Sequence, residues 1–282
     1  MVEPILQAEG LTVRFGGVVA LDDVSFSVAP GTIHAIIGPN GAGKSTCFNA
    51  MTGLYPLAAG TVRLSGERLD RVPRHRIIGR GVARTFQNLV LPDALTVADV
   101  LRLGRHHRTR AGLLGTALAL PAARRERRTD DGVVRQVAEI LGLEGHLADP
   151  VGVLPYGLRK KTEIARALCA EPEVLLLDEP VAGMNDAESR ALGERIRECR
   201  EQFGLTVLLV EHDMELVMSL SDHVTVLQSG RVIADDRPDR IQQDPVVIAA
   251  YLGADPIELT DERDERDERD EREDRAEVVA RG

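Results

Sequence analysis

A nine-residue segment constrains the fold of this chain more than any other: Gly38-Pro39-Asn40-Gly41-Ala42-Gly43-Lys44-Ser45-Thr46. It fits the pattern G-x-x-x-x-G-K-[ST] in full. An apolar, β-branched run (32–37) precedes it, and a helical pattern from Lys44 to about Thr52 follows it. Strand, glycine-rich loop and helix, in that order, form a phosphate-binding loop, in which backbone N–H groups and the helix N-terminus face the phosphates. The alternative is a glycine-rich turn that happens to precede a helix, and the complete motif argues against it.

The motif assigns a role to two of its side chains. We expect Lys44 to bind the β- and γ-phosphates of a nucleotide and the hydroxyl of Ser45 to ligate Mg²⁺. A chain of 282 residues with 43% hydrophobic residues is expected to form one compact unit with subdomains. Its core must consist mostly of Val, Leu, Ile and Ala, because aromatic residues make up 3% and Trp is absent.

Charge and cysteine content exclude several other classes of protein. The formal net charge is −10, without the excess of Lys and Arg that a general nucleic-acid binder needs to neutralise phosphates. Cys47, Cys169 and Cys199 are widely spaced and form no C-x-x-C pair. We interpret them as small core residues rather than disulfides or a zinc site.

The termini and the apolar runs indicate a protein without a membrane span of its own. Residues 1–10 contain acids and a proline, unlike a signal peptide, and the longest apolar stretch, 111–123, is too short to span a bilayer. We expect the protein to be soluble by itself and to be held at a membrane, if it works there, by another chain. Residues 261–272 repeat Asp-Glu-Arg four times. A solvated, largely disordered tail is therefore expected over 254–282.

Alternating strand and helix patterns predict a parallel sheet covered on both faces. Two strands (5–14 and 24–28) open the chain, residues 60–80 suggest further short strands with a turn at Ser65-Gly66, and helical periodicity extends from about 96 to 170. The remaining expected elements are strands 174–177 and 206–210, a polar helix over 188–202, and a strand pair at 224–227 and 231–234.

Polar residues follow two of the buried strands. Asp178 and Glu179 follow the apolar run 174–177, and Glu211-His212-Asp213 comes directly after the strand 206–210. Carboxyl ends of parallel strands meet at one sheet edge, where the phosphate loop also lies. We expect Asp178 to hold Mg²⁺, largely through water, Glu179 to orient or deprotonate the attacking water, and His212 to reach the γ-phosphate. Either signal alone is weak, since acids or a surface histidine often follow a strand.

The order of these features resembles that of an ABC transporter ATP-binding subunit. The phosphate loop, Gln87, the segment Leu154–Leu158, Asp178-Glu179 and His212 follow one another within about residues 5–253. The resemblance implies an α/β P-loop NTPase fold with a RecA-like core, an antiparallel β-subdomain and a helical subdomain at about 92–168. ATP and Mg²⁺ are the implied cofactors.

The same resemblance assigns further site residues. Phe15 corresponds to the aromatic residue that stacks on adenine. Gln87 corresponds to the loop glutamine that takes part in catalysis, contacts Mg²⁺ and senses the transmembrane partner. Pro155, Tyr156 and Gly157 lie in the signature segment that caps the ATP held by the opposite subunit, and residues 182–185 would contact that subunit.

Finer details are similar to the ATP-binding subunits of branched-chain amino acid importers. They are residues 83–88, a basic insert at 104–128, residues 182–185 and 211–214, and the closing segment 244–253. Amide and urea importers share most of them. The implied function is to power such an importer at the cytoplasmic face of the inner membrane. Its partners would be transmembrane permease subunits and a second ATPase subunit, identical or different, with a solute-binding protein only indirectly involved. Alternatives are a cassette ATPase of a non-transport assembly complex and a nucleotide-gated module with weak turnover.

The signature segment departs from the family pattern. Leu-Ser-Tyr-Gly-Gln is expected where this chain has Leu154-Pro155-Tyr156-Gly157-Leu158. Pro155 offers neither a hydroxyl nor a backbone N–H, and losing a hydrogen bond to a charged oxygen costs about 1.5–3 kcal/mol. We hypothesise that this subunit hydrolyses its own ATP when a partner supplies a good signature, while ATP closed by its own signature turns over slowly. The alternative is that proline is tolerated here.

A basic stretch lies in the expected helical subdomain: Arg102, Arg105, His106, His107, Arg108, Arg110 and Arg124–Arg128. We interpret it as a solvated charged face. Contact with anionic lipid headgroups or with an acidic loop of a partner is the next alternative. A nucleic-acid site is disfavoured, because aromatic residues for base stacking are absent.

Overall fold

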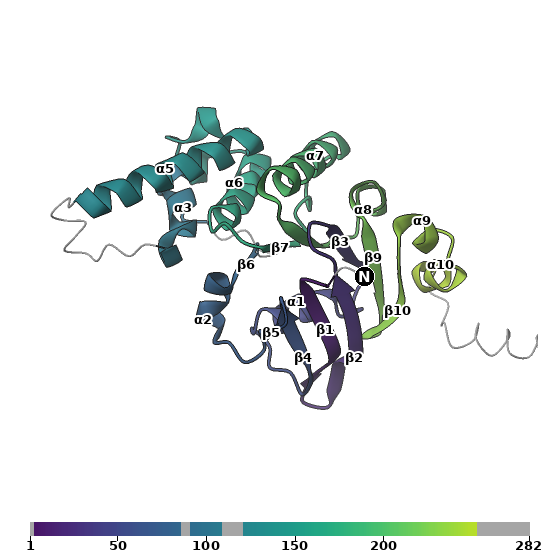
Figure 1. The fold of residues 1–282 in the computed structure, drawn as a ribbon. Coiled ribbons are helices and arrows are strands. Elements are labelled where there is room, and N and C mark those ends of the chain that lie inside the picture. Colours follow the sequence, from purple (N-terminus) through teal and green to yellow (C-terminus); the bar gives the residue numbers. More distant parts are fainter. Residues whose placement is uncertain (1–2, 86–90, 109–120, 253–282) are drawn as a thin grey trace, which may run out of the picture.

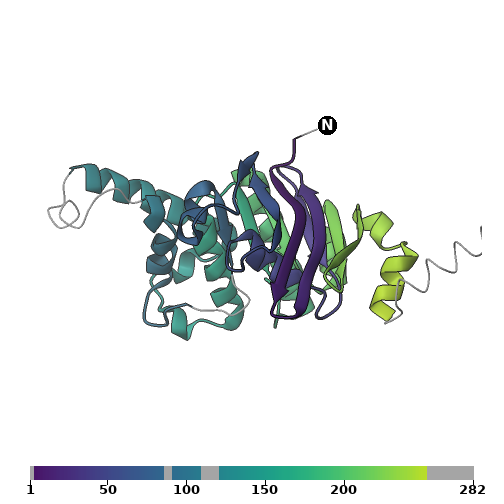
Figure 2. The ribbon, with the colours of Figure 1, turned by 90° about the horizontal axis from the view of Figure 1, so that it is seen from below.

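The computed structural model describes residues 3–85, 91–108 and 121–252, without the side chains of 121–126 and Leu252. Gln87 and the expected tail at 254–282 therefore lie outside the described residues. Strands occupy the centre of the molecule, with a helical region at one end and two short helices at the other (Figures 1 and 2).

A six-stranded sheet forms the centre of the fold. Its order is β10-β9-β3-β8-β7-β6, and every neighbouring pair is parallel except β10 with β9. The strands are β3 (Ile33–Ile37), β6 (Val82–Arg84), β7 (Val174–Asp178), β8 (Thr206–Val210), β9 (His223–Gln228) and β10 (Arg231–Asp236). The predicted parallel sheet is confirmed.

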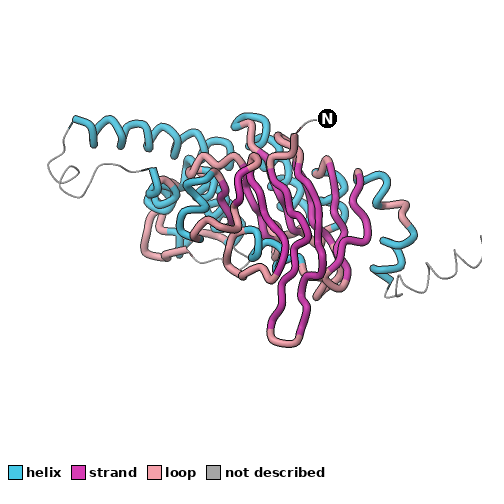
Figure 3. Tube along the Cα trace, turned by 60° about the horizontal axis from the view of Figure 1, so that its bottom comes forward, coloured by secondary structure: helices cyan, strands magenta, loops and turns pink. Residues whose placement is uncertain are grey.

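Helices pack on both faces of this sheet, and Figure 3 shows helices lying around the central strands. In β7, Leu175 and Leu177 join a core with the helical region, whereas Val174 and Leu176 join the core around the first helix. Alternate residues thus face two different cores. Because both faces of the strand are buried, every residue before Asp178 is apolar. The helices are α1 (Lys44–Met51), α2 (Arg74–Ile77), α3 (Val97–Gly104), α5 (Pro121–Leu141), α6 (Tyr156–Leu168), α7 (Asp186–Phe203), α8 (Met214–Leu220), α9 (Pro238–Ile241) and α10 (Pro245–Leu252).

A second, antiparallel sheet packs on the other side of α1. Its order is β2-β1-β4-β5, from strands β2 (Val18–Val28), β1 (Leu6–Phe15), β4 (Ala59–Leu64) and β5 (Glu67–Arg68). Phe48 of α1 is fully buried between the two sheets. Cys47, Cys169 and Cys199 are buried and free, as predicted.

Two expected strands differ from the structure. The second strand begins at Val18 instead of residue 24, because it continues through an irregular register at Asp22-Asp23, where Asp23 adopts φ 57°. Those two acids interrupt the apolar alternation from which the strand was predicted. Residues 74–77 form α2 and Ile78–Arg80 a 3₁₀ helix, so the expectation of strands up to residue 80 is wrong beyond β5. Pro73 precedes this helix and provides a suitable backbone angle (φ −55°) for its start.

The predicted solvated face of the basic stretch is confirmed for His106, His107, Arg108, Arg127 and Arg128, which are exposed, but it is wrong for Arg105. Arg105 is only 4% exposed: it pairs with Asp130 of α5, bonds Glu171 at 3.0 Å and donates to the Cys169 carbonyl at 3.1 Å. Arg102 pairs with Asp131 at 2.9 Å. These arginines therefore hold α3 against α5 and the end of α6. Within the described residues, no helix is both long and apolar enough to cross a bilayer.

Candidate nucleotide site

Three adjacent parallel strands bring the predicted catalytic residues to one edge of the central sheet. β3, β8 and β7 are neighbours, and they are followed by the phosphate loop, by Glu211-His212 and by Glu179. Because parallel strands end on the same side, segments far apart in the sequence meet here. The sequence predicted that these residues meet at one sheet edge, and the structure adds the strand order β3-β8-β7.

A cavity of about 500 Å³ lies over the phosphate loop. Glu179 reaches it from the end of β7, and the turn at Ser229-Gly230 closes one side. The rest of the lining consists of Val18, Val19, Ala20, Asn40, Gly41, Ala42, Gly43, Lys44, Ser45 and Thr46. Thus most of the predicted phosphate-loop residues and one predicted catalytic carboxylate share one cavity, while Gly38 and Pro39 lie at the start of the loop.

Two glycines are required for the loop to take this shape. At Gly38, a Cβ atom would lie 2.0 Å from the Leu227 carbonyl oxygen. At Gly43, φ is 104°, and a Cβ atom would lie 2.8 Å from the Leu21 side chain. Gly43 is also the N-cap of α1, so no side chain caps the first turn of this helix, which contains no acid. The N–H groups of that turn therefore remain available for an anion.

Lys44 is the first residue of α1 and is largely buried. Its ammonium donates to the carbonyls of Gly38 at 2.6 Å and Pro39 at 3.0 Å. Burial lowers the pKa of Lys44, and the charges of Glu179 and Asp178 oppose that shift. An ammonium has three N–H donors, so one remains for a phosphate oxygen while the other two hold the loop.

Asp178 ends β7 with 1% exposure. Its Oδ2 accepts a bond of 2.7 Å from the Arg84 guanidinium, whereas its Oδ1 is buried and has no hydrogen-bond partner. Burial raises the pKa of Asp178, and Arg84 counteracts this. A buried carboxylate oxygen without a protein partner beside a phosphate loop is suited to a hydrated cation.

Glu179 has an unusual backbone conformation. Its φ of 49° lies in the left-handed region, which a residue with a side chain seldom adopts. Its N–H donates to the Val210 carbonyl at 2.9 Å, which extends the β7–β8 pairing by one residue. Strain of this kind persists only where the surroundings impose it, and it is concentrated at functional sites.

His212 and Phe15 are not among the residues that line the cavity. The His212 side chain is 62% exposed, and its Nδ1 is 3.7 Å from a Glu211 carboxylate oxygen. The Phe15 ring is 45% exposed and packs edge-on against Tyr55 at 4.9 Å. Val18, which pairs with Phe15 across the hairpin, does line the cavity.

The signature residues lie apart from this cavity, at the N-terminus of α6. Pro155 is the N-cap, and no side chain caps the helix. The exposed ring of Tyr156 lies against Gly183, where a Cβ atom would be 3.3 Å from it. Gly157 lies near Met184 and Glu188, so the signature and the segment 182–185 form one surface.

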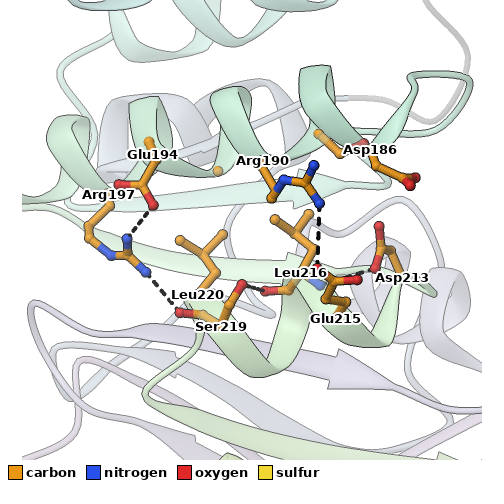
Figure 4. Close-up of a pocket in the computed structure, with 11 residues that line it drawn as sticks. Asp186, Arg190, Glu194, Arg197, Asp213, Glu215, Leu216, Ser219 and Leu220 are labelled. Atoms are coloured by element: carbon orange, nitrogen blue, oxygen red, sulfur yellow. Dashed lines mark hydrogen bonds and ion pairs between the residues drawn. The ribbon is translucent and has the colours of Figure 1, made fainter.

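A second cavity, of about 250 Å³, lies between α7 and α8 (Figure 4). It contains two arginines, and both are engaged. Arg190 is 3.6 Å from Glu215, while Arg197 bonds Glu194 and the Ser219 carbonyl at 2.7 and 2.8 Å. This cavity is therefore less suited to a nucleotide than the one over the phosphate loop.

Two residues of the site had no role in the sequence interpretation. Arg84 binds Asp178 and also donates to Asn49 of α1 and to Thr52 directly after that helix, at 2.7 and 3.1 Å. Glu211 is fully buried between two loops. A charged residue inside the buried strand β6, and an acid directly before His212, were the signals that could have identified them.

Comparisons with known proteins agree with this geometry. The profile of the ABC transporter family matches residues 21–182, and that of the branched-chain amino acid ATP-binding cassette transporter matches 231–256. Over 253 residues, 90% of the chain and 99% of the relative, the chain is 41% identical to the high-affinity branched-chain amino acid transport ATP-binding protein BraF of Pseudomonas aeruginosa and 40% identical to LivG of Escherichia coli. It is similar to the ADP conformation of an ABC transporter's ATP-binding cassette, with a TM-score of 0.77, 30% identity and coverage of 89% and 100% of the two chains.

Proposed function

Since the chain belongs to the ABC transporter family of ATP-binding subunits, we propose that it powers an importer of branched-chain amino acids. Members of this family are ATPases, and this chain is an ATPase that binds a nucleotide. The solute rests on one observation: residues 231–256 match the C-terminal segment of the branched-chain amino acid cassettes. BraF and LivG, at 41% and 40% identity, are named for the same solutes.

The residues around the cavity divide the chemistry of hydrolysis among them. The amides of the loop and of the first turn of α1 bind the phosphates, and Lys44 places its remaining N–H on them. Glu179, whose backbone is fixed at the end of β7, orients or deprotonates the attacking water. We expect His212, which follows β8, to contact the γ-phosphate, and Phe15 to stack on the adenine.

The oxygen donors present fit Mg²⁺. Ser45 offers a hydroxyl in the cavity lining, and the unpartnered Oδ1 of Asp178 offers a carboxylate oxygen at the end of β7. Oxygen ligands are what Mg²⁺ prefers, and α1 packs against β7, so the two elements are in contact. When bound, the ion would neutralise charge on the phosphate oxygens. Gln87 is the third expected ligand and lies outside the described residues.

Two surfaces support the proposed partners: the signature segment and an apolar cavity beside residues 82–84. The signature of each subunit would close the ATP of the other, and Pro155 weakens the site that this chain closes. We therefore expect a second ATPase subunit of different sequence. A mainly apolar cavity of about 380 Å³ borders residues 82–84 and includes Leu54, Ile77 and Ile78. It offers a place for a helix of a transmembrane permease, which would hold the chain at the cytoplasmic face of the inner membrane.

Reconstitution tests this proposal. Tagged chain is purified from detergent-solubilised membranes of its own cells, and the co-purified complex is placed in proteoliposomes with internal ATP and external solute-binding protein. We expect uptake of radiolabelled leucine, lost with Glu179→Gln. Uptake of urea or a short amide but not of leucine would contradict the assignment of branched-chain amino acids as the solute. Absence of any permease from the complex would instead favour an assembly ATPase.

A further inference from the structure

Glu211 is a fully buried carboxylate for which the chemistry above has no use. It follows the last residue of β8 and is 0% exposed. Its Oε1 accepts the N–H of Val181 at 3.0 Å, and its Oε2 accepts the N–H of His212 at 3.1 Å. One side chain thus binds the backbone of two loops: the loop that follows Glu179 and the loop that contains His212.

The contact with Val181 completes a clamp around Glu179. Pro180 has no N–H, so the backbone donors of residues 179–181 are those of Glu179 and Val181. Val210 accepts the first at 2.9 Å and Glu211 accepts the second. Both acceptors lie at the end of β8. This clamp spans the point at which Glu179 has φ 49°, a conformation that the surroundings must impose.

The same carboxylate fixes the relative position of the two catalytic loops. Its second oxygen holds the backbone of His212, and that oxygen is also 3.7 Å from the His212 Nδ1. Burial raises the pKa of Glu211, and the hydrogen bonds from Val181 and His212 oppose that shift.

We propose that Glu211 is a positioning residue for ATP hydrolysis, which holds Glu179 and His212 in register by accepting one backbone N–H from each loop. This inference rests on the proposed roles of Glu179 and His212. It assigns no contact with the nucleotide to Glu211. Its loss should therefore affect turnover and leave ATP binding, through the phosphate loop, intact.

The test is steady-state ATP hydrolysis by the full chain with Glu211→Gln. Glutamine offers one acceptor and one donor group, so one of the two backbone N–H groups would face a donor. We expect kcat to fall about tenfold or more while KM for ATP stays within about twofold, since the lost interaction acts on the reacting groups alone. Glu215→Gln, the same change on an exposed side chain four residues on, should leave kcat unchanged.

Two further variants separate positioning from a merely structural role. Glu211→Asp keeps the charge but is one methylene shorter, so it cannot reach both loops, and we expect the same selective loss of kcat if Glu211→Gln fails to fold. In a His212→Ala background, Glu211→Gln should lower kcat by less than a further factor of about three, because the effects of residues that act as a unit are non-additive.

Opposite results overturn the inference. If kcat of the folded Glu211 variants stays within about twofold of wild type while Glu179→Gln abolishes turnover, Glu211 is structural only and the proposed site stands. The inference is also contradicted if the loss of kcat in the Glu211→Gln, His212→Ala double variant equals the product of the losses in the two single variants. If Glu179→Gln retains turnover, the proposed site is wrong and this inference falls with it.

Discussion

Arg84 and Asp178 form a buried ion pair between the ends of β6 and β7, with their side chains 9% and 1% exposed. The guanidinium also bonds Asn49 of α1 and Thr52 directly after that helix, and lies 5.6 Å from the centre of the Phe48 ring. It therefore fixes Asp178 against the helix that follows the phosphate loop. Removing one partner of such a pair leaves a buried charge without compensation.

We predict that Arg84→Met lowers the free energy of unfolding by about 3 kcal/mol, the cost of breaking a buried pair. Urea unfolding of the two proteins measures it. Arg80→Met is the matched control: Arg80 pairs with Glu67 at the surface, with 52% and 75% exposure, and should contribute less than about 1 kcal/mol. Equal effects of the two substitutions would show that burial of the Asp178 pair has no special cost.

His34 is a buried histidine in β3, 1% exposed. Its Nε2 is 2.7 Å from the Thr225 hydroxyl, which donates its own proton to Asp235 at 2.5 Å. Thr225 must therefore accept from His34, which fixes the neutral ring with its proton on Nε2. Burial lowers the pKa of His34 from 6.5 to about 4; Asp235 opposes this shift, and the nearby His223 adds to it.

This shift predicts an acid-sensitive fold. Below pH 6.5 the unfolded chain binds a proton at His34 that the folded chain does not bind until about pH 4. Stability must therefore fall as the pH falls through this window. Between pH 7 and pH 5 the contribution of His34 is about 2 kcal/mol.

Urea unfolding of wild type and His34→Gln at both pH values measures it. The loss on acidification should be smaller by that amount in the variant, because His223 and Asp235 are present in both proteins. His75→Gln, at an exposed position, should behave like wild type. The same pH dependence in all three proteins would contradict the assignment.

Among the elements, the start of α6 differs from those of its neighbours. The Thr96 side chain caps α3, Asp213 caps α8, and Asn185 forms a capping box with Glu188 at α7. At α6 the corresponding residue is Pro155, which offers no side-chain acceptor. The ring of Tyr156 nonetheless packs against Gly183, so the surface proposed to contact a second subunit is formed.

Pro155→Ser is predicted to raise the ATPase rate of the purified chain at least several-fold. A serine hydroxyl would restore a hydrogen bond to a charged phosphate oxygen, an interaction of about 1.5–3 kcal/mol. The control is Pro150→Ser, which replaces an exposed proline in the same helical region, away from the signature. If wild type is already fast and Pro155→Ser changes nothing, the signature tolerates proline and the argument for an asymmetric pair is wrong.

The sequence predicted those elements whose signal is local. Strand β8 was predicted at its observed bounds, and α1 and β7 within one residue, because uninterrupted apolar runs and the complete loop motif mark them. The start of β2 was missed because Asp22-Asp23 breaks its alternation. The buried Arg105 was misread, because its partners Asp130 and Glu171 are 25 and 66 residues away. The clamp made by Glu211 likewise depends on the order of β7 and β8 in the sheet.

At the scale of the whole molecule, the folded unit accounts for nearly the full length of the relatives. Alignments to BraF and LivG span 99% of those proteins but 90% of this chain, so about a tenth has no counterpart in them. The described structure ends with α10 at Leu252, and residues 261–282 hold eleven acids and six arginines. Such a composition has no apolar face with which to pack.

We therefore predict that a chain ending at Gly253 folds and hydrolyses ATP like the full-length protein. Its melting temperature and kcat should match those of the full chain, because α10 and the core that Val247 joins are retained. A chain ending at Asp244 is the control: without α10 it exposes the apolar surface that Val247 covers, and should melt lower. If removal of residues 254–282 alone changes kcat or the melting temperature, the Asp-Glu-Arg segment contacts the folded unit and regulates it.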